Sequence, residues 1–360
     1  MTVLQVCAYG ADYPGNFIAS LEALEKALAA KSIRTIYAFA ESAADKSWCQ
    51  RISKRTKVYF LPVAKARILP KTYQMMGKIY AENNVDIVHS HFELYDIPAT
   101  VMAPKKTNVF WHLHDPISVG HGLRGKLWRF QYGVVGRKAT LLSVADYYRK
   151  TVIDMGFPEK QTATVLNGIN LNRVRKQAYG ADRRYDFLTF GWDFERKGDD
   201  LILQACDLLE RDGYKFRLLL NGNDLTWPKL EQYLNGRKPT YLICGDPVSD
   251  INLLFDESRL FIQASRRETF SYAVCEAAYA GLPVISSDIA GLEWAHELST
   301  VTFFPNEDAH ALYEAMRVFL DGRSLPEHEI HMSRKHIEDT LSVEVWVRHI
   351  MQHYGLLKKE

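Results

Sequence analysis

The amino-acid sequence predicts an α/β protein made of two doubly wound, parallel-sheet domains that face each other across a cleft. Short apolar segments alternate with amphipathic ones along the chain, which is typical of parallel strands covered by helices on both faces. The alternation stops in a polar stretch at residues 167–184 and then restarts. The length of 360 residues also suits two domains of roughly 150–180 residues better than one.

The first half of the chain begins with an apolar strand at residues 3–9, followed by a loop rich in Gly, Pro and Asn. A helix is predicted over residues 17–28, because apolar side chains recur there at spacings of three and four. Mostly helical stretches separate the remaining predicted strands of this half, which lie at 33–39, 57–63, 85–91, 108–114 and 140–145.

The second half repeats the pattern, with predicted strands at 185–192, 216–222, 240–245, 260–265 and 282–287. Because the stretch 167–184 is polar and without clear period, it is typical of a linker. The predicted domains are therefore 1–170 and 171–339. The last segment, 340–360, has apolar residues at helical spacing and is predicted to pack back on the first domain.

The composition excludes several classes of protein. Hydrophobic residues make up 47% and charged residues 24%, which is ordinary for a folded chain. No apolar run reaches the roughly 18–20 residues of a membrane-spanning helix, and the first residues lack the basic and apolar pattern of a signal peptide. The five cysteines are scattered, which argues against a disulfide framework. We expect a cytoplasmic protein.

The charge is unevenly distributed. Residues 1–170 hold 22 of the 45 basic residues but only 13 of the 43 acidic ones. Between Lys46 and Lys78 nine basic side chains occur without an acidic one, interleaved with apolar residues. This stretch predicts peripheral contact with an anionic membrane surface, whereas a solvated basic face is the alternative. Nucleic acid is not expected as a partner, because aromatic residues are no denser there than elsewhere.

The segment 265–288 combines the features of a phosphate-binding loop. An apolar strand ends at its start, Glu268 follows in a short polar loop, and a helix is predicted to begin near Ser271. Backbone N–H groups at such a helix start favour a phosphate or diphosphate. Glu276, in the first turns of that helix, would lie within reach of a sugar hydroxyl. The alternative interpretation is that Glu268 is an acid on a surface loop and Glu276 an acid on the surface of the helix.

This segment closely resembles the donor-binding region of retaining GT-B glycosyltransferases, and it is most similar to family 4, the glycosyl transferases group 1. The resemblance covers residues 1 to about 290 and implies two Rossmann-like domains, the first for the acceptor and the second for the donor. Further segments resemble motifs of that family in the same order: VDIVHSHF (85–92), WHLHDP (111–116), VLNGIN (165–170) and FGWDFERKG (190–198).

The resemblance implies a role for each matching residue of the second domain. Glu268 would contact hydroxyls of the donor hexose, and Glu276 would bind the ribose hydroxyls of the nucleotide. The backbone of Thr269, Phe270 and Ser271 would meet the donor diphosphate.

Four further residues take roles by the same resemblance. Lys197 matches the phosphate-binding lysine, and a fixed cation there would stabilise the charge that a leaving diphosphate gains. His114 matches the histidine near the donor sugar and the reacting centre. Gly15 and Asn16 occupy the first strand–helix loop, where the family's paired glycines let the backbone approach the donor phosphate.

The sequence departs from the family pattern at several positions. The arginine expected directly after Gly191 is Trp192, and Arg196 beside Lys197 is one candidate to replace its charge. Arg266 and Arg267 are further candidates. The glycines of the E-G-F-G pattern are Thr269 and Ser271, which keep donors to phosphate, and the paired glycines of the first loop are reduced to Gly15.

Two other classes of function remain open from the residues alone. Two H-x-H pairs at strand ends predict, as one alternative, a metal-dependent hydrolase, for instance on a barrel fold. The other alternative is a two-domain protein that binds a ligand without catalysis. The pairs are His89 with His91 and His112 with His114, and Asp115 or Glu93 would add a carboxylate.

We therefore expect a retaining hexosyltransferase that takes its sugar from a nucleotide-diphosphate donor, a UDP-sugar above all. We expect no metal ion or cofactor, because the sequence has no D-x-D segment at a predicted strand end and because Lys197 and a helix start are available for the diphosphate. The resemblance implies that the departing phosphate itself helps to accept the proton of the acceptor hydroxyl, so that no protein carboxylate has to be a nucleophile. The expected acceptor is a glycan, either free or linked to a lipid, as in the assembly of bacterial surface polysaccharides. Peripheral attachment to the inner face of the membrane would bring the enzyme to such an acceptor.

Overall fold

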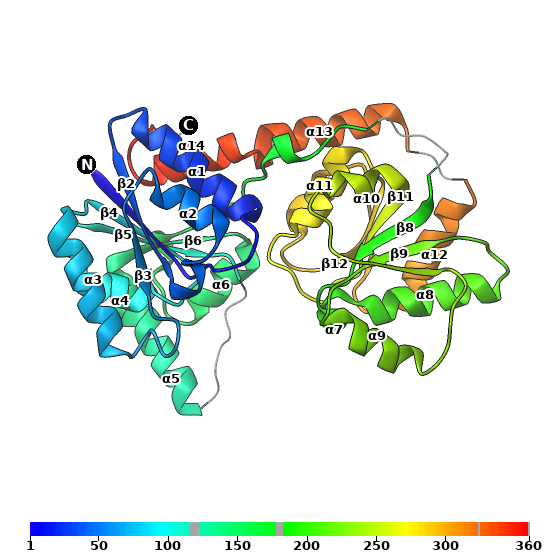
Figure 1. Cartoon of the computed structure of the whole chain (residues 1–360), viewed down its shortest axis with the longest axis horizontal. Coiled ribbons are helices and arrows are strands. Elements are labelled where there is room, and N and C mark those ends of the chain that lie inside the picture. The colour runs from blue at the N-terminus through cyan, green and yellow to red at the C-terminus, as the bar shows by residue number, and fades with distance from the viewer. Residues whose placement is uncertain (116–121, 178–182, 323–324, 359–360) are drawn as a thin grey trace. The chain divides into compact units, whose positions relative to one another are not determined.

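The computed structural model divides the chain into two compact units (Figure 1). It describes residues 1–115, 122–177, 183–322 and 325–358. The first unit consists of Met1–Gly168 together with Val343–Glu360, and the second of Ile169–Ser342. The observed division thus falls within a few residues of the expected boundaries at 170 and 340. Part of the predicted linker, residues 178–182, lies outside the described residues.

The first unit is built on a seven-stranded sheet in which every neighbouring pair is parallel. Its strand order is β3-β2-β1-β4-β5-β6-β7, so the chain starts in the middle of the sheet and winds outward in both directions. The strands are β1 (Thr2–Cys7), β2 (Arg34–Ala40), β3 (Val58–Leu61), β4 (Ile87–His91), β5 (Asn108–Leu113), β6 (Ala139–Ser143) and β7 (Thr162–Thr164).

Helices cover both faces of this sheet. One core packs α1 (Gly15–Ala29) and α2 (Ser47–Ser53) on the sheet together with α14 (Val343–His353). All five apolar residues that predicted the helix at 17–28 are buried in it. The opposite core includes α3 (Pro70–Asn83) and α4 (Asp96–Met102) together with the segment that starts at α5 (Gly122–Phe130). α6 (Asp146–Asp154) lies between β6 and β7.

The second unit has a six-stranded parallel sheet in the order β10-β9-β8-β11-β12-β13. In Figure 1, α8 (Asp199–Arg211) and α12 (Ala309–Leu320) lie along one face, and α10 (Asn252–Glu257) and α11 (Tyr272–Ala280) along the other. The strands are β8 (Tyr185–Phe190), β9 (Leu218–Asn221), β10 (Leu242–Gly245), β11 (Ser258–Gln263), β12 (Val284–Asp288) and β13 (Val301–Pro305). The remaining helices are α7 (Phe194–Lys197), α9 (Thr226–Leu234) and α13 (Glu327–Leu341).

The chain passes between the units twice, and the two passes lie side by side. Ile169 forms a parallel bridge with Ser342, and its N–H donates to the carbonyl of Leu341 at 2.8 Å. Beyond that crossing, Trp346 packs so closely on Gly168 that a Cβ at residue 168 would lie 2.7 Å from the Trp346 Cβ. The final helix therefore belongs to the first unit, on the face that α1 covers.

Every strand expected from the sequence is present, with ends shifted by at most two residues. Two strands were not predicted, β7 and β13. β7 is a polar edge strand of three residues, Thr-Ala-Thr, which has no apolar run to reveal it. None of the described helices is long and apolar enough to cross a membrane.

Candidate active site

Two strand ends of the second unit bring the predicted donor-site residues together. β8 leads through a short turn into α7, whose last residue is Lys197, and β11 leads into the loop that carries Glu268. Because parallel strands end at the same edge of the sheet, the two side chains meet there. Lys197 Nζ lies 2.6 Å from Glu268 Oε1, and an Arg196 guanidinium nitrogen lies 3.3 Å from the same oxygen.

Glu268 is held as a carboxylate by its surroundings. The side chain is 10% exposed, and Gln263 and Ser265 also donate to Oε1, at 3.0 and 2.9 Å. Burial alone would raise the pKa of Glu268, but Lys197 and Arg196 outweigh burial, so that the pKa lies below its usual value. The carboxylate can therefore accept hydrogen bonds from hydroxyl groups of a ligand. Neither Gln263 nor Ser265 was predicted as part of this site.

The loop from Glu268 to Ser271 enters α11 through a left-handed residue. Ser271 has φ +60°, a left-handed conformation that favours glycine, at the position where the related family carries glycine. Its hydroxyl accepts from the N–H of Val274 at 3.4 Å and so caps α11. A Cβ at Gly291 would lie 2.2 Å from the Glu268 carbonyl oxygen, so only glycine fits behind this loop.

Phe270 anchors the loop to Trp294. Its side chain is 1% exposed, its ring stacks on Trp294 at 4.8 Å, and its carbonyl accepts from the Trp294 indole N–H at 2.9 Å. Thr269 is half-buried between Glu268 and Phe270. The start of α11 therefore follows within a few residues of Glu268, which pairs with Lys197.

Glu276 lies in α11 and is buried, with 5% of its surface exposed. A guanidinium nitrogen of Arg173 is 4.0 Å from its Oε1. Arg173 belongs to the predicted linker, and the sequence analysis did not single it out. The structure therefore shows a buried carboxylate beside a cation, eight residues after Glu268.

Arg196 is the cation that stands beside Lys197, whereas Arg266 is engaged elsewhere. Arg266 forms a two-pronged ion pair with Asp200, with both contacts at 2.8 Å, and contacts Glu307 at 3.0 Å. Trp192, at the place of the expected arginine, is 41% exposed and stacks on Phe190. Arg267, the third candidate, is exposed, and Arg196, which also pairs with Asp193 at 3.0 Å, is the candidate that contacts Glu268.

Asp199, the first residue of α8, is a buried acid that was not predicted as part of the site. Its side chain is fully buried, and neither carboxylate oxygen has a hydrogen-bond partner among the described residues. Burial raises the pKa of Asp199 to about 8, against the opposing effect of Lys197. A Cβ at Gly191 would lie 2.4 Å from Asp199 Oδ2, so the acid fills the space that this glycine leaves.

In the first unit, Gly15 and Asn16 begin α1 rather than lying in the loop before it. Gly15 has φ +56° and opens the helix, and Asn16 is buried in its first turn. Residues 15 and 16 therefore belong to the first turn of α1.

His114 lies just after β5 and has partners on both ring nitrogens. Nδ1 is 3.0 Å from Asn167 Oδ1, and Nε2 is 3.0 Å from His91 Nδ1. The ring is 6% exposed, and burial lowers the pKa of His114 to about 4 although the Asn167 contact opposes this shift. At neutral pH the imidazole is uncharged.

The partners of His114 form a chain of hydrogen bonds that passes through Tyr354, the residue after α14. His91 Nε2 lies 2.9 Å from Gln5 Oε1, Gln5 donates to the Tyr354 hydroxyl at 3.1 Å, and that hydroxyl lies 2.7 Å from His89 Nδ1. No sequence pattern links Gln5 with Tyr354, because they are 349 residues apart.

The two H-x-H pairs bring three buried histidines close together. His89, His91 and His112 each have a ring nitrogen within 4.8 Å of the others. In a tetrahedral zinc site the ligand nitrogens lie roughly 3.4 Å apart, given Zn–N bonds of about 2.0–2.1 Å. The rings of His89 and His112 instead stack in parallel planes, 1° apart. The histidines therefore form a buried ring stack.

Comparisons with known proteins identify the family of each half of the chain. Residues 20–173 match the family model described as Glycosyltransferase Family 4, and residues 184–321 match the one described as Glycosyl transferases group 1. Each half of the chain thus matches a half of the same kind of enzyme. The chain belongs to the group 1, family 4 glycosyltransferases. This assignment and the open sheets contradict the metal-dependent hydrolase on a barrel fold.

Solved structures match the glycosyltransferase over its whole length. A glycosyltransferase from Rickettsia africae ESF-5 has a TM-score of 0.80 and 16% identity, covering 100% of this chain and 99% of that one. Anabaena Alr3699/HepE, in complex with UDP-glucose, has a TM-score of 0.78 and 16% identity, covering 99% and 100%. The fold is GT-B, as the resemblance implied.

A curated relative is the capsular polysaccharide biosynthesis glycosyltransferase CapM of Staphylococcus aureus. The identity is 21% over 236 residues, which is 61% of this chain and 62% of CapM. The chain thus spans less than two thirds of that relative's length.

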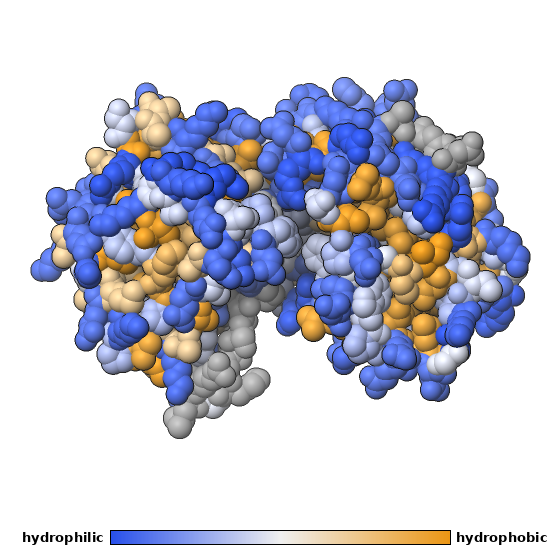
Figure 2. Space-filling view, in the orientation of Figure 1, coloured by the Kyte–Doolittle hydropathy of each residue, from blue (hydrophilic) through white to orange (hydrophobic). Residues whose placement is uncertain are grey.

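The basic stretch of the glycosyltransferase is largely neutralised, which corrects the expectation of nine uncompensated cations. Arg51 and Arg55 pair with Glu22 on α1 at 3.0 and 2.9 Å. Hydrophilic residues cover the visible surface of α1 (Figure 2). Six of the nine cations pair with carboxylates that lie outside the stretch: Lys46, Arg51, Arg55, Lys57, Arg67 and Lys78.

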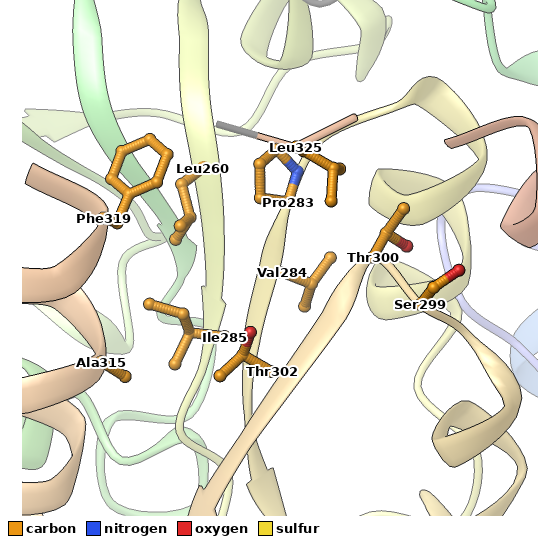
Figure 3. Close-up of a pocket in the computed structure, with 10 residues that line it drawn as sticks. All are labelled: Leu260, Pro283, Val284, Ile285, Ser299, Thr300, Thr302, Ala315, Phe319 and Leu325. Carbon is orange, nitrogen blue, oxygen red and sulfur yellow. The ribbon is translucent and has the colours of Figure 1, made fainter. Parts of the chain in front are cut away.

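A small cavity of the second unit lies apart from the site (Figure 3). Its volume is about 30 Å³, enough for one water, and mainly apolar side chains of β11, β12 and α12 line it. Two of its lining residues, Pro283 and Thr300, directly precede β12 and β13, so the cavity lies where these strands begin. Glu268 follows the end of β11, at the opposite edge of the sheet. A sugar nucleotide does not fit in it.

Proposed function

We propose that this glycosyltransferase moves a hexose from a nucleotide-diphosphate sugar, specifically a UDP-sugar, to an acceptor hydroxyl with retention of configuration and without a metal ion. The contact of Lys197 and Arg196 with Glu268, beside the start of α11, carries the proposal. HepE, which has the same fold, is described in complex with UDP-glucose, and this supports the choice of donor.

In the proposed reaction the leaving diphosphate gains negative charge as the anomeric C–O bond breaks. Lys197, Arg196 and the N–H groups at the start of α11 would stabilise that charge. The backbone of Thr269, Phe270 and Ser271 would hold the diphosphate, and Glu268 would accept hydrogen bonds from the hexose. The acceptor oxygen bonds to the anomeric carbon on the same face, and its proton passes to the departing phosphate oxygen.

The remaining predicted site residues complete the proposed donor site. Glu276, oriented by Arg173, would bind both ribose hydroxyls. Neutral His114 would exchange one of its two hydrogen bonds for a sugar hydroxyl. The start of α1, with Gly15 and Asn16, would offer N–H groups to the donor phosphate.

The proposed acceptor is a glycan or a lipid-linked glycan at the cytoplasmic face of a membrane. The name of CapM, a capsular polysaccharide enzyme, supports a role in surface polysaccharide assembly. A lipid-linked acceptor also gives the enzyme a reason to contact an anionic membrane surface.

The experiment is a screen of nucleotide sugars for thermal stabilisation and hydrolysis, with and without excess EDTA. We expect a UDP-sugar to stabilise the protein and to be consumed equally in both conditions. Glu276→Ala should weaken UDP binding at least tenfold, whereas Glu268→Ala should mainly lower turnover. Unchanged UDP affinity in Glu276→Ala would contradict the ribose contact, and rescue of an EDTA-inactivated enzyme by a divalent ion would contradict metal independence.

A further inference from the structure

The segment formed by α5 and the turn that continues it, Gln131–Val135, has one face anchored in the first unit. Trp128 and Tyr132 are 9% and 1% exposed, and their rings stack at 5.7 Å. Tyr132 also meets Trp111 of β5 edge to face at 5.6 Å, and the Arg67 guanidinium lies 3.8 Å above the Trp128 ring. The inner face of this α5 segment is therefore fixed in place.

The outer face of the α5 segment is apolar and open to solvent. Leu127 is 50% exposed, Phe130 59% and Val134 51%. Their spacing of three and four residues puts them on one side of the helical segment, opposite Trp128 and Tyr132. Single exposed apolar side chains are common, but three in one stripe on one element mark an interaction surface.

Cations border this stripe without carboxylates to neutralise them. Lys126, Arg129, Arg137 and Lys138 are exposed, and none of them forms an ion pair among the described residues. No Asp or Glu occurs in the sequence from residue 116 to 145. The stretch from Lys46 to Lys78 is different, because Arg51 and Arg55 pair with Glu22 on α1 and Arg67 pairs with Glu93.

We propose that the α5 segment is the membrane-contact surface of this enzyme, with Leu127, Phe130 and Val134 entering the headgroup region of an anionic bilayer. The four cations would then face lipid phosphates. A second copy of the chain is a poorer occupant, because a two-fold contact on this face would bring like charges together. The inference deepens the proposed function, since a lipid-linked acceptor requires the enzyme at a membrane.

The test is sedimentation of the full chain with phosphatidylcholine vesicles that contain either no phosphatidylglycerol or about a third of it, at low and high salt. The parent should bind only the anionic vesicles and leave them as salt rises. The triple variant Leu127→Ser, Phe130→Ser, Val134→Ser and the double variant Lys126→Glu, Arg129→Glu should each bind at least tenfold more weakly. Melting temperatures establish that each variant is folded.

Matched controls come from the earlier stretch. Ile68→Ser removes an apolar side chain that is 67% exposed, and Lys54→Glu, Lys65→Glu, Lys71→Glu reverses its three cations without an ion pair among the described residues. Both controls should bind anionic vesicles like the parent. Full binding by the triple serine variant, or loss of binding in the lysine control, would overturn the proposal.

Light scattering tests whether a second copy of the chain binds this face instead. A parent dimer that becomes a monomer in the triple serine variant would assign the face to self-association and overturn the membrane proposal. Transfer to a soluble acceptor is measured separately and should be equal in parent and variants. Vesicle binding without any transfer would contradict the proposed function while leaving this surface assigned.

Discussion

Lys197 Nζ and Glu268 Oε1 are 2.6 Å apart, and the two side chains are only 12% and 10% exposed. A charge that loses its partner in such a place keeps its desolvation cost, so each member of the pair depends on the other. The pair therefore links the folding of the second unit to the groups proposed to hold the donor.

Replacing one member of this pair should cost more stability than replacing both. We expect Lys197→Met and Glu268→Gln each to lower the free energy of unfolding by about 3 kcal/mol, and the double variant to lower it by less than either single variant does. Urea unfolding measures all three. Lys229→Met, which breaks an exposed ion pair with Glu195, is the control and should cost under about 1 kcal/mol. Additive losses at Lys197 and Glu268 would show that the contact carries no coupling.

Ser271 should be a strained position, because it holds a left-handed φ without being glycine. Ser271→Gly should stabilise the protein by about 0.5–1 kcal/mol, since glycine removes a strain of about 1–2 kcal/mol and weakens the cap by only a few tenths. Ser271→Ala keeps the strain and loses the cap, so it should destabilise by about 1 kcal/mol. Thermal or urea unfolding separates the pair, and the same sign for both substitutions would contradict this account.

Asp199 should make stability fall as pH rises. Its pKa is about 8 in the folded chain and near its usual value when unfolded, so between about pH 4 and 8 the folded state keeps a proton that the unfolded state has released. Stability then drops by up to about 1.4 kcal/mol for each pH unit in that window. Asp199→Asn removes this dependence, so its advantage over the parent should grow from pH 4 to 8.

The measurement is urea unfolding of parent and Asp199→Asn at several pH values. Asp224→Asn, an exposed acid of the same unit, is the control and should track the parent. Parallel pH profiles for parent and Asp199→Asn would mean that Asp199 is ionised in the folded chain.

His114 and His112 are a natural pair for separating catalysis from packing. The two rings stack at 4.2 Å, but His112 is fully buried whereas His114 is 6% exposed. His114→Ala should lower transfer more than tenfold, which is over about 1.4 kcal/mol of transition-state stabilisation, with a small change in melting temperature. His112→Ala should lower the melting temperature and leave kcat of the folded fraction near that of the parent. An inactive His114→Ala variant that is also the less stable of the two would favour a structural role.

The strands could be predicted because those of a parallel sheet, buried on both faces, form nearly continuous apolar runs. The meeting of Lys197 with Glu268 followed from the strand ends that carry them. The charge balance of residues 46–78 could not be predicted from that stretch, because Glu22 and Glu25 reach Arg55 from a helix about thirty residues earlier. The hydrogen-bond chain behind His114 was missed for the same reason. Two of its members, Gln5 and Tyr354, are 349 residues apart in the sequence and meet only in the folded chain.

The return of Val343–Glu360 to the first unit sets the order in which the chain can fold during synthesis. Trp346, Ile350 and Tyr354 fill a core that they share with residues before 170, and they leave the ribosome after the strands of both sheets. The second unit is one continuous stretch of the chain, so it can fold before the first unit is complete. Until Val343–Glu360 is made, the face of the first sheet that α14 covers stays partly exposed. We therefore expect the half made first to finish folding last, which leaves the nascent chain dependent on chaperones that cover exposed apolar surface.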